Sequence, residues 1–418
     1  MTPQAAEDPS LHRLLDRRAR SMGPTYRLFY DEPLHVVTGR GVWLEDAAGR
    51  RYLDAYNNVP VVGHCHPRVV DALSRQAATL NTHTRYANEL PVLLAERLLA
   101  TLPSEFGNVV FTCSGSESNE FACRIAMGVT GATGFIVTAH AYHGTTARLA
   151  GMSPSGGRPL GRDVFTVDAP APDEPPEALA DRVRDCIGRM AQAGVRPAGL
   201  MVDSVMATDG VVVGPAGCLR LAADAIRAAG GLSIADEVQS GFGRCGAMWG
   251  FSRHGVVPDI VTMGKPMGNG HPIGALAARR EIMAAFAATR GYFNTFGGNT
   301  VSCAVGLAVL DVIQDEDLVG HARNAGARFH RRLQGLEARH RHVAVRGAGL
   351  FFGVEVGGGD DAAGSRARRV VNAMRRAGVL IGATGPKGSV LKIRPPLPVA
   401  EEELDTIVSA LDAALHDA

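Results

Sequence analysis

Six short apolar segments, separated by stretches with helical spacing of apolar residues, constrain the fold of this chain more than any other feature. They lie at 109–112, 135–138, 199–202, 232–235, 260–263 and 275–278. Each is apolar almost throughout, which is typical of strands that are covered on both faces. Strands that alternate with helices form mostly parallel sheets. We therefore expect an α/β protein whose central sheet is mostly parallel.

The character of the sequence divides it into three regions. Residues 1–65 predict an N-terminal arm with a helix and then a β-hairpin around the turn at 48–50. Residues 66–315 hold the apolar segments and form the expected large domain. Residues 316–418 predict a smaller α+β domain, against which the N-terminal region packs. One long helical segment at 301–340 crosses the boundary between the last two regions.

Charge and cysteine content exclude several classes of protein. The 43 basic and 42 acidic residues leave a formal net charge of +1, which gives no reason to expect a nucleic-acid or membrane partner. The seven scattered cysteines form no C-x-x-C pair, as expected in a reducing compartment. There is no apolar run of the roughly 20 residues that a membrane helix needs, and the charged first twenty residues lack the apolar run of a signal peptide, so we expect none. We expect a soluble, cytoplasmic protein.

Residues with reactive or polar side chains follow five of the six predicted strands. Ligands of open parallel sheets bind at the carboxyl ends of the strands, so these residues predict one shared site. They comprise a small polar turn, an aromatic pair, two carboxylates and an amine: Ser114-Gly115-Ser116, Tyr142-His143, Asp203, Asp236 and Lys265.

Lys265 and Asp236 carry the two groups that pyridoxal phosphate chemistry requires of a protein. A lysine amine condenses with an aldehyde, and a carboxylate keeps a pyridine nitrogen protonated so that the ring accepts electrons. A simple Lys–Asp salt bridge is the alternative. The turn at 114–116 opens a predicted helix, with Ser114 and Glu117 at capping-box spacing. Its amides suit a phosphate group, although an ordinary capped helix has the same pattern.

Two other patterns do not indicate sites of their own. The segment GFGRCG at 241–246 fits G-x-G-x-x-G, but it follows an acidic pair instead of opening a first βαβ unit, so a dinucleotide site is not expected. His64 and His66 in GHCHP lack a third ligand nearby, so we predict no metal site.

Five motifs, in order along the chain, resemble those of the class III (omega-) aminotransferases, which are pyridoxal-phosphate enzymes of fold type I. They are SGSESNEFACRIA, AYHG, ADEVQSGFGR, DIVTMGKPMGNG and FNTFGGN. The resemblance covers nearly the whole chain. It implies a central sheet of the seven-stranded type with flanking helices and pyridoxal 5'-phosphate as cofactor. It also implies amine or amino acid and keto acid substrates, and a homodimer with shared active sites.

The resemblance also implies a role for individual residues. Lys265 would form the Schiff base with the cofactor, and Asp236 would pair with its pyridine nitrogen. The other cofactor contacts would be Gly115 and Ser116 at the phosphate, Tyr142 and Val238 on the ring with His143 beside it, Gln239 near the ring hydroxyl, and Thr295 at the phosphate of the partner subunit's cofactor. Arg394 would hold a substrate carboxylate with its planar fork. Asn57, Asn58 and Arg85 would contact the substrate.

The sequence leaves the reaction itself open between alternatives. Several stretches resemble the phospho-lyases that act on phosphoethanolamine and phosphohydroxylysine, with mitochondrial-type alanine–glyoxylate aminotransferases next. Asp203-Ser204 replaces the Glu-Pro of many class III aminotransferases, whereas Arg394 stands where the phospho-lyases have lysine. We interpret the chain as a transaminase that moves an amino group from an amino acid or omega-amine to a keto acid or aldehyde. A phospho-lyase and a non-catalytic pyridoxal-phosphate-binding paralogue are the alternatives.

Overall fold

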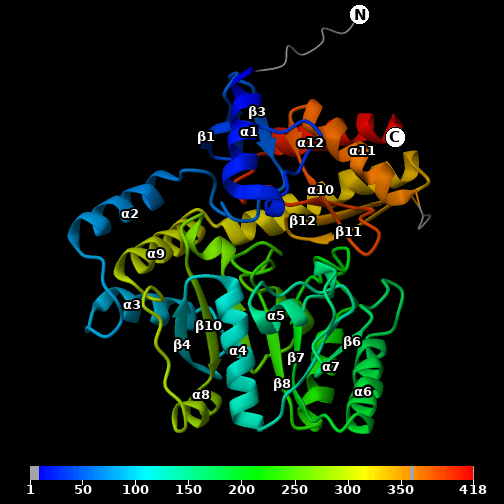
Figure 1. The fold of residues 1–418 in the computed structure, drawn as a ribbon. Helices are drawn as coiled ribbons and strands as arrows, with labels where there is room; N and C mark the ends of the chain where they lie inside the picture. Colours follow the sequence, from blue (N-terminus) through cyan, green and yellow to red (C-terminus); the bar gives the residue numbers. More distant parts are fainter. Residues whose placement is uncertain (1–8, 358–361, 418) are drawn as a thin grey trace, which may run out of the picture.

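A seven-stranded sheet forms the centre of the larger part of the molecule (Figure 1). The structure is a computed structural model that describes residues 9–357 and 362–417. Its strand order is β4-β10-β9-β8-β7-β5-β6. The strands are β4 (Phe106–Thr112), β5 (Gly134–Thr138), β6 (Val164–Val167), β7 (Pro197–Asp203), β8 (Leu232–Asp236), β9 (Ile260–Met263) and β10 (Gly274–Arg279). Strand β10 runs antiparallel to both of its neighbours, β4 and β9, and the remaining pairs of neighbouring strands are parallel. The predicted α/β class and the six predicted strands are confirmed, and the sheet has one strand more.

The unpredicted strand, β6, lies at the edge of the sheet beside β5. Its two central residues, Phe165 and Thr166, are only partly buried. An edge strand with one open side needs no fully apolar run, so its pattern gave no clear signal.

Helices cover both faces of the sheet, and this explains why its strands are apolar throughout. Along β5, Phe135 and Val137 join one buried cluster while Ile136, between them, joins another. The first cluster includes side chains of α4 (Gly115–Thr130), α5 (Ala147–Gly151) and α8 (Arg280–Ala287), and the second includes those of α6 (Glu177–Gln192) and α7 (Cys218–Ala228). Helices α2 (Pro67–Thr79), α3 (Glu89–Leu99) and α9 (Thr300–Asp315) pack beyond β4, with α9 against both α2 and α3.

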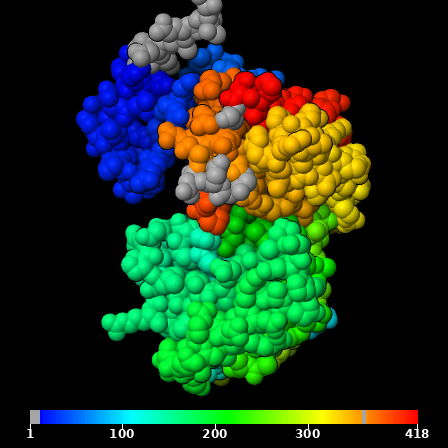
Figure 2. Space-filling view, turned by 90° about the vertical axis from the view of Figure 1, so that its right-hand side faces the viewer, coloured from blue at the N-terminus to red at the C-terminus, as the bar shows by residue number. Residues whose placement is uncertain are grey.

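The smaller part of the molecule is built from both ends of the chain (Figures 1 and 2). One sheet has the order β1-β2-β3-β13 and the other β11-β12-β15-β14. The strands are β1 (Val36–Arg40), β2 (Trp43–Asp46), β3 (Arg51–Asp54), β11 (Val343–Ala348), β12 (Phe351–Val356), β13 (Val379–Leu380), β14 (Gly382–Thr384) and β15 (Val390–Ile393). The helices are α1 (Pro9–Met22), α10 (Leu318–Arg339), α11 (Ala363–Arg376) and α12 (Glu401–His416). Strand β3 pairs in parallel with β13, so one sheet contains residues from both ends of the chain.

The N-terminal hairpin is confirmed, because β2 and β3 pair antiparallel around the predicted turn. Residues 1–8 of the predicted arm lie outside the described residues. The single helix expected at 301–340 is instead two helices, α9 and α10, separated at Glu316-Asp317. Asp317 has a left-handed backbone, with φ of 45°, and its carboxylate caps α10 by accepting a hydrogen bond from the Gly320 amide at 3.2 Å. A new N-cap of this kind starts a second helix.

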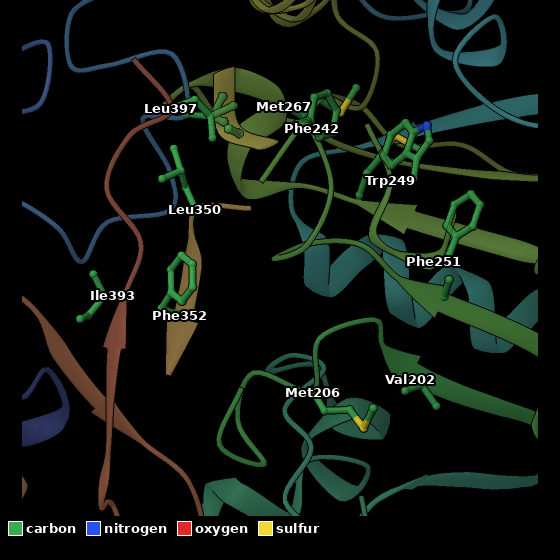
Figure 3. Close-up of a cluster of buried hydrophobic side chains, with 14 of the residues drawn as sticks. Val202, Met206, Phe242, Trp249, Phe251, Met267, Leu350, Phe352, Ile393 and Leu397 are labelled. Atoms are coloured by element: carbon green, nitrogen blue, oxygen red, sulfur yellow. The ribbon is translucent and has the colours of Figure 1, made fainter. Parts of the chain in front are cut away.

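One buried cluster continues from the large part into the small part. Figure 3 shows Leu350, Phe352, Ile393 and Leu397 of the small part near Phe242, Trp249 and Met267 of the large part, and all of them belong to this cluster. Because the core is shared, the two parts hold a defined relative position, and residues at their boundary can be placed accurately for function.

None of the described helices is both long and apolar enough to cross a lipid bilayer. Within the same residues, no three histidine, cysteine or acidic side chains are placed to hold a metal ion. His64 instead forms a 2.7 Å contact from Nε2 to the Asp54 carboxylate.

Two glycines of α10 predict opposite effects on stability. A Cβ added at Gly326 would overlap the carbonyl of Gly349 in the turn between β11 and β12, whereas at Gly335 its nearest neighbour would be a guanidinium nitrogen of Arg339 at 3.8 Å. We expect Gly326→Ala to lower the free energy of unfolding by about 1–3 kcal/mol through overpacking. Gly335→Ala should raise it by up to about 1 kcal/mol through helix propensity. Chemical denaturation measures both, and a stabilising Gly326→Ala would contradict the close packing of α10 on this turn.

Candidate active site

The residues predicted at the ends of four of the strands surround one cavity of about 300 Å³. It lies at the carboxyl ends of β4, β5, β8 and β9, where an open α/β sheet binds its ligands. The predicted residues that line it are Gly115, Ser116, Tyr142, His143, Asp236, Val238, Gln239 and Lys265. The structure therefore brings together side chains that are as much as 150 positions apart in the chain.

At one end of the cavity, the N-terminus of α4 presents free backbone amides. Ser114 caps the helix, since its Oγ accepts a hydrogen bond from the Glu117 amide at 3.2 Å. The Glu117 carboxylate turns back to the amide of Cys113 at 2.9 Å, one residue earlier than in a standard capping box. The amides of Gly115 and Ser116 have no partner among the described residues. They lie at the positive end of the helix dipole, which favours a phosphate.

Gly115 is required for close packing at this turn. A Cβ at this position would lie 2.8 Å from both methyl groups of Val238, on the cavity wall. A Cβ at Gly264, next to Lys265, would lie 2.9 Å from the Gly115 amide nitrogen. The two glycines therefore keep the ends of β4 and β9 close together and leave the amides uncovered.

Three donors hold the Asp236 carboxylate at the end of β8. Oδ2 accepts a hydrogen bond from Nδ2 of Asn119 at 2.8 Å and contacts Nδ1 of His143 at 2.7 Å, and Oδ1 accepts one from the Val238 amide at 3.1 Å. Asn119 is itself fixed, because its Oδ1 accepts a hydrogen bond from the Thr262 hydroxyl at 2.5 Å. The network orients a buried carboxylate toward the cavity.

Sequence reasoning did not identify Asn119 or Thr262. Asn119 lies one helical turn after the predicted phosphate turn, within the motif SGSESNEF. Thr262 is paired in register with Asp236 on the neighbouring strand. The packing of α4 on these strands, which a single sequence does not reveal, brings Asn119 into contact with both Thr262 and Asp236.

Lys265 follows β9 directly and begins a short 3-10 helix, Lys265–Gly268. Its φ is 26°, an unfavourable angle for a residue with a side chain, and strain of this kind is typical of functional positions. The side chain faces the open cavity, so part of its surface is accessible. Desolvation by the surrounding protein nevertheless lowers the pKa of the Lys265 amine, in spite of the opposing effect of Asp236. A lowered pKa leaves more of the amine uncharged and nucleophilic.

Asp203 ends β7 in direct register with Asp236 on β8. Its carboxylate accepts hydrogen bonds from the amides of Val205 at 3.0 Å and Ala207 at 3.1 Å. Burial, followed by the charge of Asp236, raises the pKa of Asp203 to about 7. Asp203 does not line the cavity, but Nε2 of Gln239 lies 3.3 Å from its Oδ2 and links it to the cavity wall.

Two buried cations lie on β15 and the residue after it, facing this region from the small part. Nη1 of Arg394 donates a hydrogen bond to Oε1 of Gln239 at 2.9 Å, while its Nε has no partner among the described residues. Lys392 lies two positions earlier, so both side chains share one face of the strand. Burial, and then the charges of Arg394 and Lys265, lower the pKa of Lys392 well below its ordinary value. Its amine has no hydrogen-bond partner in the described residues.

Lys392 was missed at the level of sequence, although the spacing in LKIR carried the signal. Period-two alternation places residues 392 and 394 on the same face of a strand. The sequence shows only a lysine within a short apolar strand, and its burial depends on how the two parts of the molecule pack.

Five predicted residues do not line the cavity, and one of them is Arg394, which reaches it only through Gln239. Asn57 accepts a hydrogen bond from the Val59 amide at 3.1 Å, and Arg85 is exposed, with its guanidinium 3.8 Å from the Phe293 ring centroid. Asn58 is buried and donates to the Gln239 carbonyl at 2.8 Å. Thr295 is exposed. Their contacts with substrate or with the partner subunit's cofactor stay predictions.

The cavity thus has amides for an anion at one end and, at the other, an amine of lowered pKa beside a fixed carboxylate. Tyr142 forms part of the wall between them. A phosphorylated pyridine aldehyde needs this set of groups, so the fold and the site define a pyridoxal-phosphate-dependent enzyme of fold type I. More specifically, the chain belongs to the class III aminotransferase family, because residues 29–415 match the family described as "Aminotransferase class-III".

Similar proteins include both aminotransferases and a phospho-lyase. The chain is 37% identical to "Alanine--glyoxylate aminotransferase 2 homolog 2, mitochondrial" of Arabidopsis thaliana, over 99% of this chain and 89% of that protein. It is 43% identical to a solved phospholyase from Arthrobacter in complex with phosphoethanolamine, with a TM-score of 0.93 over 97% of this chain and 100% of the other. A pyridoxal-phosphate-bound amine transaminase from an uncultivated Pseudomonas species is 28% identical, with a TM-score of 0.85 over 100% and 98% of the two chains.

These similarities confirm the predicted fold, family and cofactor. The enzyme uses pyridoxal 5'-phosphate. The residues present in the cavity fit this group, since the free amides of α4 suit its phosphate and Lys265 and Asp236 suit its aldehyde and its ring nitrogen.

The pKa of Asp203 predicts how its contribution to stability changes with pH. A carboxyl whose pKa rises from 3.8 to about 7 on folding binds its proton more tightly in the folded state. Its contribution is therefore fully present below pH 3.8 and is lost as the pH rises through 7. Asp203→Asn cannot ionise, so the Tm of wild-type apoprotein minus that of the variant should fall by several degrees between about pH 5 and about pH 8.

Asp203→Asn also loses one of the two oxygens that accept hydrogen bonds from the Val205 and Ala207 amides. This loss lowers the Tm of the variant equally at both pH values, so it cancels when the two differences in Tm are compared. Differential scanning calorimetry of both apoproteins makes the measurement. A difference in Tm that stays constant over this range would show that Asp203 is ionised throughout.

Proposed function

We propose that this enzyme transfers an amino group from an amino acid or omega-amine to a keto acid or aldehyde, and that Arg394 holds an anionic group of the substrate. Arg394 carries this proposal. Its guanidinium is buried beside the cavity-lining Gln239, and no carboxylate among the described residues is paired with it. An arginine buried without a counter-ion suits a planar carboxylate that arrives with the substrate.

The residues of the chain have distinct tasks in this reaction. Pyridoxal phosphate, when bound, supplies an aldehyde that condenses with amines and a ring that accepts electrons. Nζ of Lys265 would hold that aldehyde, and the same amine would act as the general base that takes the proton from the substrate α-carbon. Asp236 holds a proton at the ring nitrogen, while Asn119 and His143 keep its carboxylate oriented.

A second candidate reaction is the elimination of phosphate from an O-phospho amino alcohol. The 43% identity to a phospholyase solved with phosphoethanolamine favours it. Lys392 and Arg394 together would suit a phosphate as well as a carboxylate, since both are anions. The two reactions share the abstraction of a proton by Lys265, and they differ in whether the substrate carries a leaving group on its β-carbon.

A panel of amines separates the two reactions. We expect the holoenzyme, mixed with L-alanine, 4-aminobutyrate or other amino acids, to convert bound cofactor to the pyridoxamine form with one keto or aldehyde product per site. Arg394→Ala should lower kcat/KM for these substrates by roughly 10- to 100-fold, because a hydrogen-bonded charge contact is lost. Absorption spectra and product analysis give the readout, and Lys265→Ala serves as the unreactive control.

Other outcomes of the panel are equally informative. Release of phosphate and ammonia from phosphoethanolamine, with the cofactor returned unchanged, would replace transfer by elimination. An intact cofactor spectrum with no response to any amine would support a non-catalytic pyridoxal-phosphate-binding paralogue instead.

The active enzyme, we further propose, is a homodimer whose subunits complete each other's sites. Large apolar side chains are exposed on the segments around Thr295 and in the neighbouring region before and within α3: Tyr86, Val92, Leu93, Phe293 and Phe296. A group of this kind marks a protein interface. His83 lies between the two segments, stacked on Tyr86 with a centroid distance of 5.0 Å and edge-on to Phe293 at 6.1 Å. Thr295 would then reach the phosphate of the cofactor that is bound to the partner.

Subunit mixing tests this arrangement. Thr295→Glu would place a negative charge beside the phosphate of the neighbouring cofactor, and Lys265→Ala removes the reactive amine, so each homodimer should be inactive. A hybrid dimer contains one site with neither change, and random mixing should restore about a quarter of the wild-type activity. Activity after refolding the two variants together measures this. No recovery, with the dimer mass confirmed by sedimentation, would place Thr295 in the site of its own chain.

A further inference from the structure

Arg244, in the segment GFGRCG, is a fully buried arginine that no carboxylate contacts among the described residues. Its guanidinium donates hydrogen bonds to three neutral oxygens instead. Nε donates to Oδ1 of Asn58 at 2.7 Å, and Nη1 donates to the Leu350 carbonyl at 3.1 Å and to the Pro395 carbonyl. One side chain of the large part thus binds an N-terminal segment and two segments of the small part.

This arrangement is a poor way to gain stability. Burial, and then the charge of Arg394, lower the pKa of Arg244 to about 9, and its Nη2 has no partner among the described residues. A buried charge is expensive to desolvate, and apolar side chains of similar volume commonly pack such positions with equal or greater stability. The arginine therefore has a different advantage, which is the fixed geometry of its planar fork.

The backbone on both sides of the boundary holds the Arg244 guanidinium in this position. Phe242 and Gly243, just before Arg244, both have positive φ, at 57° and 84°. In the small part, Gly349 approaches so closely that a Cβ there would overlap the backbone of Cys245 and Gly246. Figure 3 shows Leu350, next in the chain, together with Leu397 and Phe242 at this boundary.

The bonds of Arg244 form a closed circuit around Arg394. Pro395, whose carbonyl Arg244 binds, directly follows Arg394 in the chain. The side chain of Arg394 donates to the Gln239 side chain at 2.9 Å. The Gln239 carbonyl accepts from Asn58 at 2.8 Å, and Asn58 accepts from Arg244. The position of Arg394 relative to the large domain is therefore set from both its side chain and its backbone.

We propose that Arg244 is a positioning residue that fixes Arg394 at the correct distance from Lys265 for a substrate with an anionic group. The hydrogen bond from Arg244 to the Pro395 carbonyl fixes the distance between the Arg394 backbone and the cavity. A displacement of about 1 Å at such a contact is enough to lower the rate by about 100-fold. Arg244 lines no part of the cavity, and its bond to the carbonyl of the residue after Arg394 is the route by which it acts on the anionic group. This inference rests on the proposed role of Arg394.

The test compares a substrate that has an anionic group with one that lacks it. The variants are Arg244→Lys, which keeps a basic side chain and loses the fork, and Asn58→Ala, which removes one partner of the fork. We expect kcat/KM for L-alanine or phosphoethanolamine, whichever the enzyme turns over, to fall by roughly 10- to 100-fold in Arg244→Lys. The fall for ethylamine should be less than about threefold, and Asn58→Ala should show the same pattern more weakly.

The affinity for an unreactive carboxylate gives a second measurement, which does not depend on turnover. Propionate, titrated into the holoenzyme and followed by the cofactor absorption band, should bind about tenfold more weakly to Arg244→Lys. The band itself and the Tm report whether the variant is folded and loaded. Arg323→Lys is the matched control, because Arg323 donates to the Gly246 carbonyl at 3.0 Å in the same loop but contacts neither Asn58 nor Pro395. It should behave as wild type.

A double-mutant comparison decides between positioning and a merely structural role. In an Arg394→Ala background, Arg244→Lys should have little further effect on the anionic substrate. An equal loss in both backgrounds, or an equal loss for ethylamine, overturns the inference and leaves the proposed function standing. If Arg394→Ala alone does not distinguish the two substrates, the proposed role of Arg394 fails, and this inference fails with it.

Discussion

The parallel pairing of β7, β8 and β9 is the constraint on which the rest of the site depends. Its register places Asp203 beside Asp236, and Asp236 beside Thr262, with Lys265 three residues beyond. A slip of one residue would turn each of these side chains to the opposite face of the sheet. The apolar residues before them are buried between helices on both faces, which leaves the strands no alternative register. The hydrophobic core therefore sets the geometry of the chemistry.

This register also concentrates charge where water is largely excluded. Adjacent carboxylates repel each other, and the pKa of Asp203 is raised while Asp236 keeps three donors. Burial lowers the pKa of Lys265, Lys392 and Arg394, and the charge of Arg394 adds to this effect for the two lysines. A phosphorylated cofactor and, on the proposed function, an anionic substrate would supply the negative charge that this group of cations lacks. The site is thus electrostatically more favourable when it is loaded than when it is empty.

Local patterns were sufficient to predict the elements that are buried on both faces and the residues at their ends. Lys265 and Asp236 were identified because apolar runs end abruptly at reactive side chains. What local patterns could not show was contact between distant segments. Asn119 meets Asp236 through helix packing, Lys392 is buried by the approach of the small part, and β6 lacks a strong pattern because it is an edge strand. Asn58 has its amide bound to Gln239 and Arg244, a role that no local pattern indicates.

The dependence on distant contacts is strongest for substrate recognition, because the cofactor and the substrate are held by different parts of the molecule. The groups that suit the cofactor all lie on one rigid sheet and the helix that follows β4. Arg394 and Lys392 belong to the small part, which is formed by the two ends of the chain. On the proposed function, its distance from the sheet would decide which anion fits, and a change in that distance would alter substrate choice without disturbing the cofactor. Arg244 lies at this boundary, where its side chain binds two carbonyl groups of the small part.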